Sequence, residues 1–129
     1  MPSILNSLKL LADPTRLRLV LLLAEESLSV AELQEILGMG QSRISTQLGQ
    51  LKKASLVSVQ RSGKNNIYSA QPEKELLGIA RKAGAELEDR KRDLASLSHI
   101  LNKRKDRTRA YFDELAGKFG RQYVPGRSW

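Results

Sequence analysis

The sequence contains no cysteine, so it offers no disulfide, no thiol nucleophile and no thiolate ligand for a metal. It also lacks long apolar runs, and no segment approaches the roughly 18–20 apolar residues that a membrane-spanning helix needs. Its start lacks the basic segment and the small-residue cleavage site of a secretory signal peptide. These absences predict a cytoplasmic protein that does not span a membrane.

Acidic residues are missing from a long central segment. Between residues 36 and 72 there is no aspartate or glutamate, whereas a solvated surface normally mixes both signs. The basic side chains of that segment are Arg43, Lys52, Lys53, Arg61 and Lys64. The whole chain has a net charge of +8 and a pI near 10.0. Such a one-sign surface on a basic protein is typical of binding to a polyanion, either a nucleic acid or an anionic membrane. We expect no membrane partner, because the apolar stripe of the basic helix consists of Leu and Ala without the Trp and Phe that an interfacial helix tends to carry.

Catalytic constellations are absent as well. The chain has one histidine, His99, and shows no Ser-His-Asp set, no paired carboxylates and no phosphate-binding loop. A single histidine without cysteine, or without a carboxylate at ligand spacing, is far more often a surface residue than a metal ligand. We therefore expect no enzymatic activity, no metal site and no cofactor.

The 129 residues suffice for one domain with a sizeable core. Apolar spacing predicts a short first helix over residues 5–12 and a second over residues 14–26. An Asp-Pro pair separates them, because Asp caps a helix and Pro suits the first helical position. The second helix is apolar on nearly all sides and is expected to be buried. For its two arginines, Arg16 and Arg18, we favour a solvated position over a phosphate contact.

Two further helices joined by a glycine-containing turn make a helix-turn-helix pattern. Ser29 and Glu32 form a capping box at the start of the first of these helices, and Gly38 ends it. The second is expected to run from Gln41 to about Ala54. Its polar and basic side chains are Gln41, Ser42, Arg43, Ser45, Thr46, Gln47, Gln50, Lys52 and Lys53. Amides and hydroxyls can pair with base edges in the major groove, and lysines with phosphates.

A basic hairpin follows this motif. Residues 56–60 and 67–70 alternate as strands do, and residues 62–66 between them are rich in turn formers. Arg61 and Lys64 lie at the expected tip. A hairpin after a helix-turn-helix is a wing, and we interpret these two cations as phosphate contacts. The alternative is that they only keep an exposed hairpin soluble.

The next segment is predicted to be one long helix, from Glu73 to about Arg109. Apolar residues repeat in it every seven positions, at Ala80, Leu87, Leu94 and Leu101. A long helix with one apolar stripe needs a partner surface, and the same helix of a second subunit supplies one. We therefore predict a homodimer with an interface that contains Leu5, Leu8, Leu87, Leu94, Leu97 and Leu101.

The chain changes character after residue 107. Five of its six aromatic residues lie beyond Ala110, namely Tyr111, Phe112, Phe119, Tyr123 and Trp129. Aromatic side chains need burial, which so short a segment cannot supply by itself. Either they pack on the winged domain or the dimer, or they lead into a larger domain, the alternative that we favour. We divide the chain into a winged domain over residues 1–107 and an aromatic-rich tail over 108–129, which we interpret as a linker into a further domain.

These motifs together resemble the ArsR/SmtB family of bacterial winged helix-turn-helix repressors. The resemblance rests on Leu-Ala-Asp-Pro-Thr-Arg-Leu-Arg at 11–18, Leu-Ser-Val-Ala-Glu-Leu at 28–33, Gln-Ser-Arg-Ile-Ser at 41–45 and the wing pattern at 61–68. It implies a homodimer, joined through its first and last helices, that places each recognition helix in the major groove of a palindromic operator. The residues that it implies face the bases are Gln41, Ser42, Ser45 and Gln47.

The chain departs from the family at the metal-sensing positions. Many relatives carry Cys-x-Cys on the first helix of the motif, where this chain has Ser29 and Ala31. The family's other site, made of Asp and His on the last helix, would need more than His99. The resemblance therefore implies a regulator that does not sense metals through these sites and has an unknown effector.

The tail carries a second resemblance. Tyr111-Phe112-Asp113-x-x-Ala116 is similar to the entry of S-adenosylmethionine-dependent methyltransferase domains fused behind such regulators. The strand and Gly-rich loop that such an enzyme needs are absent from the 129 residues. The chain would then be the regulatory part of a longer fusion, with S-adenosylmethionine or its demethylated product as a candidate effector.

The sequence thus predicts a mainly α fold with a small β-hairpin wing and a long C-terminal dimerisation helix. The predicted function is sequence-specific repression of transcription by a homodimer on double-stranded DNA. Two alternatives stay open. One is a winged helix that binds nucleic acid non-specifically or binds another protein, and the other is the regulatory domain of a methyltransferase fusion.

Overall fold

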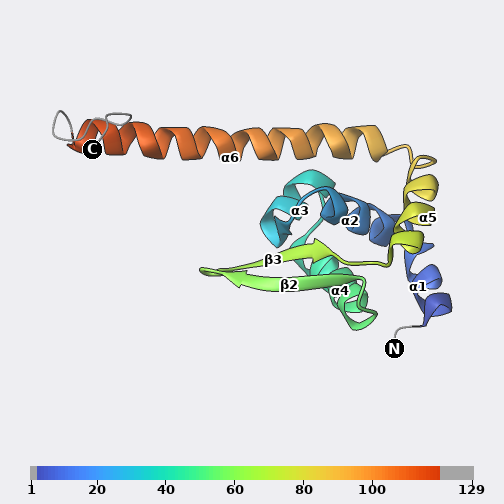
Figure 1. Ribbon diagram of the computed structural model, residues 1–129. Helices are drawn as coiled ribbons and strands as arrows, with labels where there is room; N and C mark the ends of the chain where they lie inside the picture. The colour runs from blue at the N-terminus through green and yellow to red at the C-terminus, as the bar shows by residue number, and fades with distance from the viewer. Residues whose placement is uncertain (1–2, 120–129) are drawn as a thin grey trace. The chain divides into compact units, whose positions relative to one another are not determined.

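The computed structural model describes residues 3–119, which form a mainly helical chain with one small antiparallel sheet. The helices in Figure 1 are α1 (Ile4–Leu11), α2 (Pro14–Glu25), α3 (Val30–Leu37), α4 (Gln41–Lys53), α5 (Lys74–Gly84) and α6 (Arg90–Phe119). The strands are β1 (Leu28–Ser29), β2 (Val57–Ser62) and β3 (Asn65–Ala70). The predicted winged helix-turn-helix fold with a long C-terminal helix is confirmed. The chain divides into two compact units, one up to Leu97 and one from Ser98 onward.

Helix α2 lies at the centre of the first unit. It begins where predicted, because the Asp13 side chain accepts a hydrogen bond from the backbone N–H of Arg16 at 3.0 Å and Pro14 takes the first helical position. Residues 19–22 are at most 1% exposed. The helix contacts α1, α4, α5 and β3. Burial on all these sides explains why α2 is apolar around nearly its whole circumference.

Helices α3 and α4 form the helix-turn-helix. The predicted capping box is confirmed: the Ser29 hydroxyl accepts from the Glu32 N–H at 3.2 Å, and the Glu32 carboxylate accepts from the Ser29 N–H at 3.0 Å. Gly38 ends α3 at a φ of +66°, a left-handed conformation that glycine adopts readily. The chain therefore turns sharply and begins α4 at Gln41.

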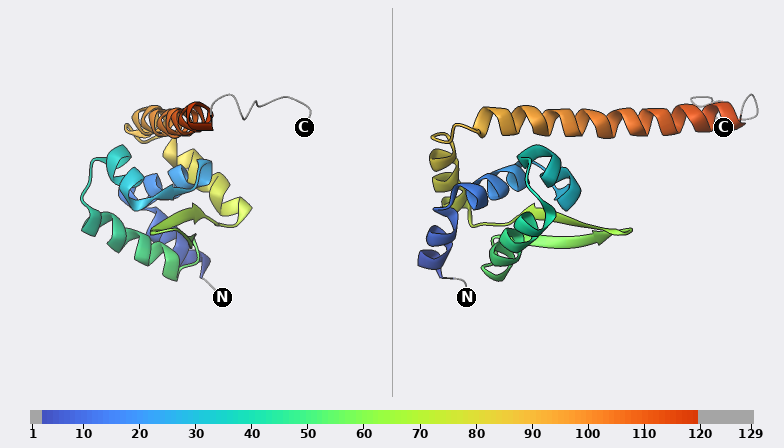
Figure 2. Two further views of the ribbon diagram at one scale, coloured as in Figure 1. Left: turned by 90° about the vertical axis from the view of Figure 1, so that its left-hand side faces the viewer. Right: turned by 180° about the vertical axis from the view of Figure 1, so that it is seen from behind.

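The wing belongs to a three-stranded sheet ordered β1-β3-β2. Strands β2 and β3 pair from Val57 opposite Ala70 to Ser62 opposite Asn65, so only two residues, Gly63 and Lys64, form the turn. The strands are therefore longer and the turn shorter than predicted. Gly63 has a φ of +62°, which suits a tight hairpin turn. The end of the hairpin extends beyond α4 in Figure 1 and in the right-hand view of Figure 2.

Strand β1 is not predicted from the sequence, because two residues cannot show the alternation of a strand. It pairs with β3, Leu28 opposite Tyr68 and Ser29 opposite Ile67. Since Ser29 also caps α3, this pairing connects the start of the helix-turn-helix to the base of the wing. The helix-turn-helix and the hairpin are thus parts of one framework.

The predicted single helix from Glu73 to Arg109 is wrong, because the chain turns at residues 85–89 between α5 and α6. Gly84 ends α5 and packs so closely on α2 that a Cβ there would lie 2.2 Å from Cδ1 of Leu21. A glycine that is both a poor helix former and required by this contact weakens the helix at that point. Leu87 lies in the turn, so the stripe at seven-residue spacing does not continue from α5 to α6.

The part of the second unit that the structure describes is the remainder of α6, which continues without a break to Phe119. The helix passes through residues 107 and 108 with no change in secondary structure. Tyr111 and Phe112 are exposed and contact each other edge to face, with 5.6 Å between ring centroids. The predicted roles of Tyr123 and Trp129 lie outside the described residues. No helix within residues 3–119 is long and apolar enough to cross a membrane.

Candidate nucleic-acid interface

Helix α4 presents a polar face to solvent. Its buried side consists of Ile44, Leu48 and Leu51. Because successive residues of a helix are 100° apart, Ser42, Thr46 and Lys53 lie opposite that side. The remaining predicted contacts flank them, with Gln41, Ser45 and Lys52 on one edge and Arg43 and Gln47 on the other. All are exposed except Gln47, which is half-buried.

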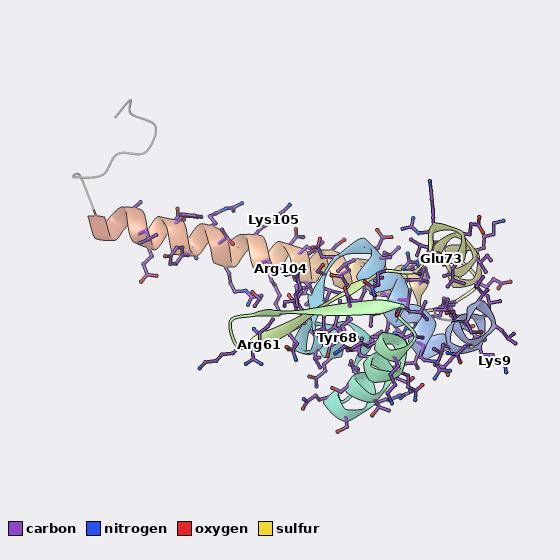
Figure 3. All side chains as sticks on the ribbon, turned by 60° about the horizontal axis from the view of Figure 1, so that its bottom comes forward. Lys9, Arg61, Tyr68, Glu73, Arg104 and Lys105 are labelled. Atoms are coloured by element: carbon purple, nitrogen blue, oxygen red, sulfur yellow. The ribbon has the colours of Figure 1, made fainter. Side chains whose placement is uncertain are left out.

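The tip of the wing carries the other two predicted contacts. Arg61 and Lys64 are exposed, and Figure 3 shows Arg61 near the end of the hairpin, far from Lys9 on α1. The Arg61 Nε donates a hydrogen bond to the carbonyl oxygen of Gly63 at 3.3 Å, so the turn holds the guanidinium beside the tip. Helix α4 and the hairpin therefore expose cations and neutral polar groups, with no carboxylate in their sequence.

Two arginines connect α4 to the start of α2, and neither connection is predicted from the sequence. Arg43 Nη2 donates to Oγ1 of Thr15 at 3.3 Å. Arg16 Nη1 donates to the side-chain oxygens of Gln47 at 3.0 Å and Gln50 at 3.3 Å. The prediction that Arg16 is solvated is wrong, because the residue is half-buried and its guanidinium is hydrogen-bonded to side chains of α4. No local pattern indicates this, since the partners are 31 and 34 residues away.

The expected solvated position of Arg18 is also wrong. Its Nε and Nη2 each donate to one carboxylate oxygen of Asp93 at 2.8 Å. Both side chains are buried. The hydrogen bond to the Asp93 carboxylate raises the pKa of Arg18 above its ordinary value, although burial acts in the opposite direction. Arg18 therefore fixes α2 to the first turn of α6 and is not available to a phosphate.

Gly49 lies in the middle of the exposed face of α4. Close packing is a common reason for a glycine inside a helix, but a Cβ at Gly49 would have no neighbouring atom within 4 Å. The absence of a side chain is therefore not explained by packing within the chain. It keeps the outer face of α4 shallow between Thr46 and Lys53.

Replacing Gly49 with alanine is expected to stabilise the protein by about 1 kcal/mol, because alanine loses less backbone entropy in a helix and meets no other atom here. Urea denaturation measures the change as a higher midpoint at an unchanged slope. Gly84→Ala is the matched control and should destabilise, since its Cβ would overlap Leu21. A Gly49→Ala variant less stable than the parent would contradict this account of the open face.

The predicted dimer-contact leucines occupy different environments. On α1, Leu5 and Leu8 are 63% and 38% exposed, and Leu94 in the first turns of α6 is 37% exposed. Leu97 is only 5% exposed, so it is already covered within one chain and has little area left for a partner. Leu101, in the second unit, is half-buried. Of the set in the first unit, Leu5, Leu8 and Leu94 keep an open apolar surface.

An exposed polar helix in a helix-turn-helix, followed by a basic hairpin paired to the same framework, defines the winged helix-turn-helix class of DNA-binding proteins. The model of the family described as "Bacterial regulatory protein, arsR family" matches residues 13–59. A relative from Mycobacterium tuberculosis, "Uncharacterized HTH-type transcriptional regulator Rv0081", is 46% identical over 77 residues, which cover 57% of this chain and 68% of the relative. The chain belongs to the ArsR family.

Other comparisons agree with this assignment. The "Biofilm growth-associated repressor" of Xylella fastidiosa is 43% identical over 63 residues, 49% of this chain and 55% of that protein. The crystal structure of M. tuberculosis Rv0081 is similar at a TM-score of 0.54 and 36% identity, and covers 75% of this chain and 87% of its own. The transcriptional regulator HlyU from Vibrio vulnificus has a TM-score of 0.57 at 27% identity, over 63% of this chain and 83% of its own.

Proposed function

We propose that this chain is a cytoplasmic, sequence-specific transcriptional repressor that binds a palindromic operator as a homodimer. The observation that carries the proposal is the exposed face of α4 and the hairpin, which offers amides, hydroxyls and cations without an acidic residue between positions 36 and 72. Amides and hydroxyls read base edges, while cations hold the phosphate backbone. One of the relatives is named as a repressor, which supports repression rather than activation of transcription.

The proposed contacts divide into two groups by chemistry. Gln41, Ser42, Ser45 and Thr46 lie on the first turns of α4, where a recognition helix reaches base edges. Arg43, Lys52 and Lys53 on α4, and Arg61 and Lys64 on the wing, would contact phosphates. In a dimer the two copies of α4 would enter major grooves about 34–36 Å apart, one helical turn of DNA.

The effector is proposed to act elsewhere than at the family's cysteine site. The Ser29 hydroxyl accepts a hydrogen bond from the Glu32 N–H and caps α3. Ala31 has no ligand atom. Among the residues that the structure describes, no group of three or more His, Asp or Glu side chains is placed to hold a metal ion. S-adenosylmethionine and its demethylated product remain the first compounds to test.

Fluorescence anisotropy tests the proposal directly. The chain is titrated into labelled duplex from its own upstream region and into a scrambled duplex, across a series of salt concentrations. Specific repression requires a preference for the upstream duplex of about a thousandfold or more. Equal and steeply salt-dependent binding to both duplexes would contradict it and indicate a non-specific winged helix.

Replacing Lys64 with alanine is expected to weaken binding to the operator and to scrambled DNA by a similar factor. One lost phosphate contact should also reduce the slope of log affinity against log salt by about one. Lys9→Ala is the matched control, because Lys9 is also exposed but lies on α1, far from the hairpin tip in Figure 3. If the slope of log affinity against log salt were the same in both variants and in the parent, Lys64 would not contact DNA.

A further inference from the structure

Arg16 holds an unusual position at the junction of three segments. Its Nε donates to the carbonyl oxygen of Leu10, at the end of α1, at 2.7 Å. Its Nη1 donates to Oε1 of Gln47 at 3.0 Å and to Oε1 of Gln50 at 3.3 Å. The bond to Leu10 fixes the guanidinium, and the guanidinium in turn fixes two side chains on the α2-facing edge of α4.

The chemistry of arginine decides which end of each amide is held. A guanidinium only donates hydrogen bonds, so the amide atom that faces it must be oxygen and not nitrogen. The NH₂ group of each glutamine is therefore the end left for another partner. A glutamine that is free to rotate presents both ends, and in that state it can pair with adenine, accepting from N6 and donating to N7.

We propose that Arg16 is a positioning residue that turns Gln47 into a donor-only reader of the operator. Arg16 takes one of the two lone pairs of the Gln47 oxygen and holds that oxygen on the α2 side, so the end left for the DNA is the NH₂ group. That group can donate to guanine O6 or N7, or to thymine O4, whereas the two-bond pair with adenine would need the second lone pair to face the base as well. This inference rests on the proposed function. It specifies which bases, guanine or thymine, α4 selects at the base pair that Gln47 reads. Gln50 is held in the same way at a longer distance, 3.3 Å against 3.0 Å, and is more exposed.

The experiment is selection of bound duplexes from a library with randomised positions, followed by sequencing. The parent chain is compared with Gln47→Met, Arg16→Met and Gln47→Glu. Gln47→Met identifies the base pair that Gln47 reads, because preference flattens there and not at other positions. At that pair the parent should favour guanine or thymine, and Arg16→Met should shift the preference toward adenine by about tenfold.

If Arg16→Met folds poorly, Gln47→Glu still tests the proposal. Gln47 is only half-buried, so we expect this variant to fold. A carboxylate still accepts from Arg16 but has no N–H, so it should favour cytosine, which donates from N4. A preference unchanged by Gln47→Glu would mean that Gln47 presents its oxygen to the base, which overturns the proposal. A parent chain that prefers adenine at that pair would overturn it as well.

Two other outcomes would assign Arg16 a different role. Equal weakening of all duplexes with unchanged preferences would make Arg16 merely structural. A salt slope lower by about one on operator and scrambled DNA alike would make it a phosphate contact. Both results overturn the positioning role while leaving the proposed repressor intact. If the parent chain enriches no motif at all, the proposed function fails, and the assignment of Arg16 fails with it.

Discussion

Replacing Asp93 with alanine is expected to destabilise the protein by about 3–5 kcal/mol. The substitution leaves the Arg18 guanidinium in a site that is only 8% exposed, without the carboxylate that accepts two of its hydrogen bonds. The only carboxylate left near it among the described residues is that of Asp89, 3.5 Å from Nη1 and partly solvated, so most of the cost of desolvating the charge is left uncompensated. Arginine cannot escape by losing its proton, because a guanidinium stays protonated in proteins.

Urea denaturation at one fixed protein concentration measures this effect, since the stability of a dimer depends on concentration. Arg90→Ala is the matched control on the same helix. Arg90 lies 3.7 Å from the Glu25 carboxylate in a partly solvated pair, and such pairs contribute about 1 kcal/mol or less. If Asp93→Ala lowered the free energy of unfolding by no more than Arg90→Ala does, the Arg18 guanidinium would not be buried against Asp93 as described.

A double replacement separates the pair from the site that it occupies. Arg18→Leu combined with Asp93→Leu removes both charges and fills the space with apolar groups. Buried ion pairs replaced in this way are often as stable as the parent or more so. We therefore expect the double variant to recover most of the loss caused by Asp93→Ala. Recovery would show that the cost lies in the orphaned charge and not in the shape of the α2–α6 contact.

The elements that the sequence predicts well are those whose signals are local. The Asp-Pro start of α2, the Ser29–Glu32 capping box and the end of α3 at Gly38 each depend on residues within one helical turn. The polar face of α4 follows in the same way from the spacing of its buried residues. Short-range hydrogen bonds and helical period are therefore sufficient to place the recognition helix.

The features that the sequence does not predict depend on contacts between distant residues. Arg18 and Asp93 are 75 positions apart, and neither has a pattern around it that points to the other. Gly84, which ends α5 before the break, packs against Leu21, a contact that only the packed structure reveals. The bonds of Arg16 to α4 have the same origin. When the partner of a charged side chain lies on a distant segment, nothing in the sequence around that side chain indicates the pairing. The sequence alone then predicts, wrongly, that the charge is solvated.

Replacing Leu5 with glutamate is expected to dissociate the proposed homodimer and to lower operator affinity by about a hundredfold or more. Leu5 is 63% exposed, and Ile4 beside it is 64% exposed, so the substitution removes no contact from the core of one chain. Exposed apolar groups of this size on one helix are typical of an interface. A carboxylate buried there without a partner would oppose association. Sedimentation analysis gives the mass, and anisotropy the affinity.

The loss of affinity follows from the loss of the second half-site. Two recognition helices held together bind with an effective concentration that two separate chains lack, and the gain is about 10²–10⁴. Asn6→Glu is the matched control, since it places the same charge on the next residue of α1, which points to a different side. A Leu5→Glu variant that remained dimeric would exclude α1 from the interface. A monomer that kept full operator affinity would instead show that one α4 and one wing suffice for recognition.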